Sequence, residues 1–103
     1  MNLTETAACL SELGNEKRLT IFRYLIKKGK EGAPVGELQQ ELGIPGSTLS
    51  HHISHLIKVG LLEQERQSRT LICRAQYPVL EEMINFLLEE CCSDEMKPTR
   101  TSC

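Results

Sequence analysis

The sequence of 103 residues predicts a mainly α-helical domain with one small β-hairpin. Apolar residues recur with a helical period in several segments, most clearly over residues 47–60. Two short strand-like runs, at 61–65 and 70–74, flank a polar turn. The length suits one domain, and a domain this small buries only about 60–65% of its unfolded surface, so dimerisation would stabilise it.

Two helices are expected at the beginning of the chain. The first follows Thr4 as the N-cap and ends at Gly14, and the second follows Asn15 and ends near Lys28. The apolar stripe of the first is Ala7, Ala8, Leu10 and Leu13. The buried face of the second is predicted to be Leu19, Phe22, Leu25 and Ile26. These helices would supply most of the scaffold.

The next two helices are separated by a short break. A helix over 35–42 enters through Pro34 and ends at Gly43, and the Ile44-Pro45 bond disfavours a continuous helix. A helix over 47–60 follows. Helix, short turn containing glycine and second helix form the helix-turn-helix pattern.

The helix over 47–60 presents two different faces. Its apolar stripe is Leu49, Ile53, Leu56 and Ile57. The other face carries hydroxyl, imidazole and ammonium groups without a carboxylate: Ser47, Thr48, Ser50, His51, Ser54, His55 and Lys58. Such a face can approach a polyanion and bond to phosphates and base edges, so we interpret it as a DNA-recognition helix. The alternatives are an ordinary solvated face, a capping role for Ser47, and a metal role for His51 and His55 at i, i+4.

The hairpin carries Arg66 and Arg69 at its turn, and we expect both to contact DNA. The pattern Ser47-x-x-Ser50-His51-His52-Ile53-x-x-Leu56-x-x-x-Gly60-Leu61-Leu62, followed by Arg66-x-x-Arg69, resembles the winged-helix repressors of the ArsR/SmtB family. The resemblance runs from about Ala7 to Cys92 and implies a winged helix-turn-helix with about five helices and a two-stranded wing. It also implies a homodimer, formed through the first and last helices, that binds a double-stranded DNA operator. Ser68 stands where the family usually has glycine.

The last helix is predicted to begin at Tyr77-Pro78 and to reach the adjacent cysteines. Its apolar stripe is Leu80, Met83, Ile84, Leu87, Leu88 and Cys91. This stripe is expected to form the dimer interface, and packing within its own core is the alternative. We assign residues 1–92 to the DNA-binding and dimerisation domain and residues 93–103 to a flexible tail that carries a terminal thiol.

Three of the five cysteines are grouped towards the end of the chain, at Cys91, Cys92 and Cys103. The Cys-x-x-Cys spacing of structural zinc sites is absent, whereas three thiolates suit trivalent arsenic, antimony or bismuth. The arrangement resembles the arsenic-responsive ArsR repressors, which implies arsenic as the inducer. A thiol redox or persulfide sensor of the same fold is the alternative. Cys9 and Cys73 are expected to be packing residues.

The net charge of −2 is unevenly distributed. Residues 47–76 carry four basic and two acidic side chains, whereas residues 77–96 carry six acidic and no basic ones. A basic face can therefore meet DNA while the acidic helix lies away from it. No signature of an enzyme or organic cofactor is present. No leader or apolar run near 18 residues is present either, so we expect a cytoplasmic protein without a membrane partner.

Overall fold

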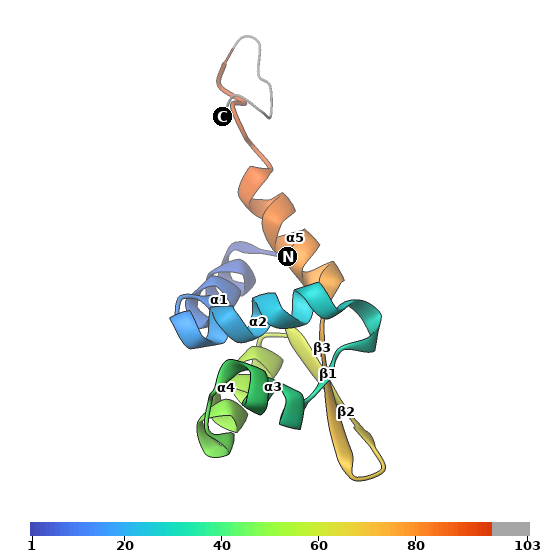
Figure 1. The fold of residues 1–103 in the computed structure, drawn as a ribbon. Helices are drawn as coiled ribbons and strands as arrows, with labels where there is room; N and C mark the ends of the chain where they lie inside the picture. The colour runs from blue at the N-terminus through green and yellow to red at the C-terminus, as the bar shows by residue number, and fades with distance from the viewer. Residues whose placement is uncertain (96–103) are drawn as a thin grey trace.

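The computed structural model describes residues 1–95, so Cys103 and most of the predicted tail lie outside the described residues. The elements are α1 (Leu3–Leu13), α2 (Glu16–Lys28), a 3₁₀ turn (Gly29–Glu31), β1 (Ala33–Pro34), α3 (Val35–Leu42), α4 (Gly46–Lys58), β2 (Leu62–Gln67), β3 (Thr70–Ala75) and α5 (Tyr77–Leu88). Figure 1 shows α2 across the middle, with α1 and α5 on one side and α3, α4 and the hairpin tip on the other. The predicted mainly α-helical fold with a hairpin wing is confirmed.

The sheet has three antiparallel strands in the order β1-β3-β2, one more than predicted. The additional strand, β1, pairs Ala33 with Cys73, and its two residues are too few to produce a sequence pattern. Gly32 precedes it with φ 65°, and a Cβ there would lie 2.1 Å from the Cys73 carbonyl oxygen. Only glycine therefore allows the backbone at residue 32 to approach the backbone of β3 this closely.

The core lies between α2, α4 and the inner face of the sheet. Its fully buried side chains include Ile21, Leu25, Leu38, Leu49, Leu56, Leu61 and Cys73. Two predicted core residues are instead exposed, Leu19 at 41% and Ile57 at 38%. Ile21 takes the buried position on α2 and follows Leu19 by two residues, or about 200° around a helix, so the two side chains point in opposite directions.

The apolar stripe of α1 is not covered within the single chain, because Ala7, Ala8 and Leu10 are exposed. The buried residues of α1 are Thr6 and Cys9. The Thr6 hydroxyl donates to the Asn2 carbonyl oxygen at 2.8 Å, which satisfies the polar group and permits its burial.

The N-cap of α1 is Asn2 rather than Thr4. Its side chain accepts from the Glu5 N–H at 2.8 Å, and the Glu5 carboxylate accepts from the Asn2 N–H at 2.9 Å. This reciprocal capping box satisfies two N–H groups at the helix start.

Helix α5 begins as predicted but ends earlier. The Tyr77 hydroxyl donates to the Ile26 carbonyl oxygen at 2.7 Å and so attaches the start of α5 to α2. The helix ends at Leu88, and Cys91 and Cys92 lie beyond it in turns, with Cys92 at φ 58°. The prediction that both cysteines belong to the last helical turn is therefore wrong.

Candidate nucleic-acid interface and thiol pair

The turn between α3 and α4 depends on a left-handed glycine. Gly43 has φ 64° and ψ 30°, and its N–H donates to the Gln39 carbonyl oxygen at 3.0 Å. A Cβ there would meet no atom within 4 Å, so its backbone conformation and not lack of space favours glycine. Pro45 then occupies the N-cap of α4, and the chain turns directly into the second helix.

The polar face of α4 is available to a partner, as the sequence predicted. Five of the seven side chains are exposed, namely Ser47, Ser50, His51, Ser54 and Lys58, and two are half-buried, namely Thr48 and His55. No side chain caps α4, so the Ser47 hydroxyl is not used in that way. The Ser54 hydroxyl donates to the His51 carbonyl oxygen at 2.7 Å. These exposed hydroxyl, imidazole and ammonium groups fit contact with a polyanion.

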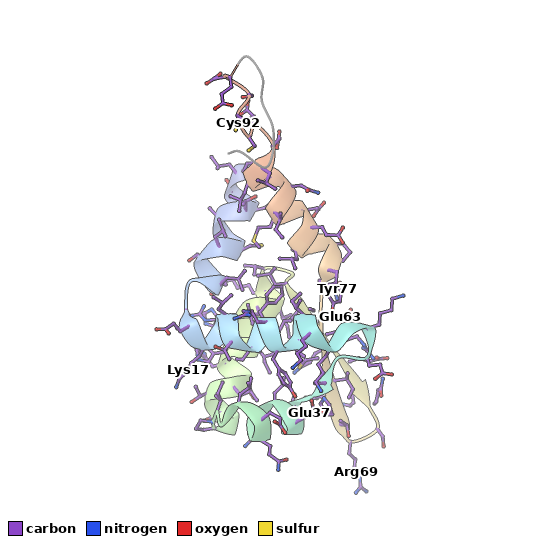
Figure 2. All side chains as sticks on the ribbon, turned by 45° about the horizontal axis from the view of Figure 1, so that its top comes forward. Lys17, Glu37, Glu63, Arg69, Tyr77 and Cys92 are labelled. Atoms are coloured by element: carbon purple, nitrogen blue, oxygen red, sulfur yellow. The ribbon has the colours of Figure 1, made fainter. Side chains whose placement is uncertain are left out.

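The wing carries three arginines with different surroundings. Arg66 and Arg69 are exposed, and Figure 2 shows Arg69 extending from the tip of the hairpin. Arg74 instead binds the Glu65 carboxylate at 2.7 Å and the Lys30 carbonyl oxygen at 2.9 Å. Arg74 thereby lowers the pKa of Glu65. Its charge is engaged within the protein, which leaves Arg66 and Arg69 as the cationic groups at the tip.

Helix α3 is fixed to α2 by a shared carboxylate. The Glu37 carboxylate accepts a hydrogen bond from the Tyr24 hydroxyl at 2.5 Å and forms an ion pair with Lys28 at 2.8 Å. The hydrogen bond from Lys28, followed by that from Tyr24, lowers the pKa of Glu37. This arrangement holds the first helix of the helix-turn-helix against the scaffold.

His55 contacts a residue that sequence reasoning did not connect with it. Its Nδ1 lies 3.1 and 3.2 Å from the two carboxylate oxygens of Glu12 on α1. Arg18 on α2 forms an ion pair with the same carboxylate. Glu12 lies 43 residues before His55, and no local pattern joins them. The predicted DNA-binding residue His55 is therefore also part of the junction between three helices.

His52 is buried on the inner side of α4 and was not assigned a role from the sequence. It is 8% exposed, and its Nδ1 has no hydrogen-bond partner within residues 1–95. Burial lowers the pKa of His52, and the nearby positive charge of Arg18 lowers it further. Both effects favour the neutral form of the ring.

The two adjacent cysteines after α5 bring their sulfur atoms together. Cys91 Sγ and Cys92 Sγ lie 3.8 Å apart at hydrogen-bond distance, and both residues are half-buried. Cys103, the third predicted ligand, lies outside the described residues. Within residues 1–95 the structure assembles no group of three side chains that could hold a metal ion. His51 and His55 therefore belong to no such group among these residues.

Cys9 and Cys73 are free thiols and both are buried, in agreement with the packing roles predicted for them. Cys9 donates to the Val59 carbonyl oxygen at 3.6 Å, and Cys73 accepts from the Gln64 amide at 3.4 Å. Burial raises the pKa of both thiols.

Residues 13–65, which include α2, α3 and α4, match the family model described as "Helix-turn-helix domain". The chain belongs to this helix-turn-helix family. A nodulation protein, NolR of Rhizobium meliloti, is 37% identical over 65 residues, which cover 63% of the chain and 51% of that protein. The chain thus spans about half the length of this curated relative.

Solved structures agree with the helix-turn-helix assignment. NolR from Sinorhizobium fredii is 30% identical over 84% of this chain and 83% of its own, with a TM-score of 0.66. An ArsR-like transcriptional regulator from Rhodococcus sp. RHA1 has a TM-score of 0.74 at 23% identity, over 88% and 82% of the two chains. The resemblance to ArsR-type winged helices is confirmed.

The family match assigns a helix-turn-helix domain to residues 13–65. The Rhodococcus neighbour is a transcriptional regulator, in agreement with the expectation that the chain is not an enzyme. None of the helices within residues 1–95 is long and apolar enough to cross a bilayer.

Proposed function

We propose that this protein is a repressor that binds its operator as a homodimer and is released by trivalent arsenic or antimony at Cys91, Cys92 and Cys103. The observation that carries the proposal is the separation of 3.8 Å between Cys91 Sγ and Cys92 Sγ. Two sulfurs at this distance can share one soft ion, since zinc–sulfur bonds of about 2.3 Å at a tetrahedral angle also separate two sulfurs by about 3.8 Å.

The DNA-binding part of the proposal uses α4 and the wing. Ser47, Ser50 and His51 lie exposed in the first half of α4, the half that reads base edges in helix-turn-helix proteins. Arg66 and Arg69 at the wing would contact phosphates or the minor groove beside it. Each half of the dimer would then bind one half-site of a pseudo-palindromic operator.

The dimer would form through an apolar face that the described residues of one chain leave exposed. On α1 it includes Leu3 at 73% and Leu10 at 40% exposure, and on α5 it includes Ile84 at 44%, Leu87 at 57% and Leu88 at 40%. Contiguous exposed apolar residues on two packed helices are typical of a protein interface. A second copy is the occupant we propose, since a two-fold interface also sets the spacing of two recognition helices.

The early end of α5 changes how release would occur. Adjacent residues of an α-helix point about 100° apart, so chelation by two residues within a helix would have to distort it. Cys91 and Cys92 already lie outside the helix, and Leu87 and Leu88 of the proposed interface lie just before them. Ligation would therefore act on the turn next to the interface. A coupling of about 1–3 kcal/mol would lower DNA affinity about 5–150-fold.

The proposal is tested by fluorescence anisotropy of the reduced protein on the DNA upstream of its own gene. Arsenite, zinc and hydrogen peroxide are added in separate titrations. We expect arsenite to release the DNA, and Cys91→Ser or Cys92→Ser to abolish release. Cys9→Ser is the matched control, because this buried thiol lies apart from the pair and should leave release unchanged.

The alternatives give other results in the same assay. Release by peroxide and not by arsenite would favour the thiol redox or persulfide sensor. Arsenite-dependent release that persists after replacement of Cys91, Cys92 and Cys103 together by serine would refute the proposed inducer site.

A further inference from the structure

The carboxylate of Glu12, at the end of α1, connects α1 with both α2 and α4. Glu12 accepts from His55 of α4 through both oxygens, at 3.1 and 3.2 Å, and pairs with Arg18 of α2 through one of them. A carboxylate has about four acceptor sites, so it can bind both partners at once. The recognition helix is thus attached to α1 through one of its DNA-facing residues.

His55 is the most exposed of the three side chains at this junction. The Glu12 and Arg18 side chains are each 16% exposed, whereas the His55 side chain is 33% exposed. An ionised carboxylate only accepts hydrogen bonds, so the Nδ1 of His55 must carry the proton shared with Glu12. The other ring nitrogen, Nε2, is then the atom that remains to contact a partner.

The surroundings make Glu12 the acidic member of a basic cluster. Arg18 and Lys17 of α2 both contribute positive charge near His52, and the His51 ring packs edge-on against His55 with centroids 4.5 Å apart. A carboxylate close to a DNA-binding face repels phosphates, so charge alone disfavours its presence there. An ion pair between α1 and α2 would also not require contact with α4.

We infer that Glu12 is a positioning residue for DNA binding, which orients the ring of His55 and holds α4 so that Nε2 faces the DNA. The inference rests on the proposed contact of α4 with DNA and goes beyond it, because Glu12 itself lies on α1. The direction in which DNA affinity changes when Glu12 is neutralised distinguishes positioning from a charge effect. If Glu12 acted by charge alone, its neutralisation would strengthen DNA binding, whereas loss of positioning weakens it.

The test compares Glu12→Gln with Glu81→Gln. Both variants remove one negative charge, but Glu81 is exposed on α5 and its side chain forms no hydrogen bond or ion pair within residues 1–95. Affinity for the DNA upstream of the protein's own gene is measured by anisotropy. We expect Glu12→Gln to weaken binding about 5- to 20-fold, as for loss of a charge-assisted hydrogen bond, and Glu81→Gln to leave it unchanged or slightly stronger.

A double-mutant cycle shows whether Glu12 acts through His55. In a His55→Ala background, Glu12→Gln should have no further effect on DNA affinity. In the DNA-free protein, the ¹⁵N shifts of the His55 ring should indicate a proton fixed on Nδ1, and this preference should disappear in Glu12→Gln. Thermal unfolding of each variant identifies loss of fold, and the ring shifts of native protein remain informative if one variant is unstable.

Three outcomes would overturn the inference. Binding by Glu12→Gln that equals or exceeds that of the wild type would assign Glu12 a charge effect only. An equal loss in the His55→Ala background would show that Glu12 acts through Arg18 or the fold. If the wild type bound no DNA, the proposed function would fail as well, a result distinct from wild-type binding that Glu12→Gln leaves unchanged.

Discussion

Helices α4 and α5 are similar in length and amphipathic pattern, yet they bury their apolar residues to very different degrees. Helix α4 has 13 residues and buries four of them, Leu49, His52, Ile53 and Leu56. Helix α5 has 12 residues and buries only Met83. The more apolar helix, α5, is therefore the less buried one, since Ile84, Leu87 and Leu88 are all exposed.

The difference reflects the partners of each helix within the chain. Helix α4 packs against α1, α2 and β2, so its stripe is covered from several sides. Helix α5 packs mainly against α1, whose own Leu3 and Leu10 are exposed. The half of the molecule that contains α3, α4 and the wing, here called the α4 side, thus buries the apolar stripe of α4 within the chain and exposes a polar face. The half that contains α1 and α5, here called the α5 side, exposes an apolar face, and in our proposal a second copy of the chain buries this face.

The largest expected effect is on the α5 side. Leu87→Asp places a charge in the proposed interface twice per dimer, so we expect the dimer dissociation constant to rise at least about 1,000-fold, or about 4 kcal/mol. Leu19→Asp is the matched control, because Leu19 is 41% exposed but lies on α2. Sedimentation velocity measures both. A wild-type monomer at micromolar concentration, or an intact Leu87→Asp dimer, would contradict the proposed interface.

The next effect concerns the internal stability of the α4 side. Leu56 is fully buried, so Leu56→Ala should lower the free energy of unfolding by about 3 kcal/mol. Ile84→Ala, made in the monomeric Leu87→Asp protein, should lower it by less than about 0.5 kcal/mol, because Ile84 is 44% exposed. Urea unfolding followed by circular dichroism compares the two. Equal losses would mean that α5 is packed within its own chain.

A pH effect should separate His52 from the exposed His51 on the same helix. Burial lowers the pKa of His52 in the folded protein, so the unfolded chain binds its proton first as the pH falls. Stability should therefore be full above about pH 6.5 and decline below it, by at most about 1.4 kcal/mol per pH unit. Unfolding free energies at several pH values between 6.5 and 5 measure the slope.

The controls for this slope are two variants on the same helix. His52→Gln should flatten the pH dependence, whereas His51→Gln, at an exposed position, should retain it. A slope that survives in His52→Gln would show that another group is responsible.

Elements with strong local signals were predicted well from the sequence. Asn15 caps α2 through its side chain, Gly43 ends α3, and the proline-containing break separates α3 from α4, all as expected. These features depend on residues within a few positions of one another, so the sequence displays their causes directly.

The misses have physical causes that lie outside any local window. Leu19 and Ile57 fit an apolar period, but which face becomes buried is decided by the neighbouring helices. The Glu12–His55 contact joins residues 43 positions apart. The end of α5 at Leu88 has no glycine or proline to mark it, so the apolar stripe continued into Cys91 without a visible stop.

The smallest expected effect tests whether the α4 side is free of strain. Ser68, in the wing turn, has φ 59°, a left-handed conformation that costs a non-glycine residue about 1–2 kcal/mol. Glycine removes this cost but gives the unfolded chain more freedom, so Ser68→Gly should raise stability by about 0.5–1 kcal/mol. Gly43→Ser is the reverse test at φ 64°, where an added side chain meets no atom, and it should destabilise by a similar amount. If Ser68→Gly proved neutral, the serine would contribute a compensating interaction, and the wing would carry no removable strain.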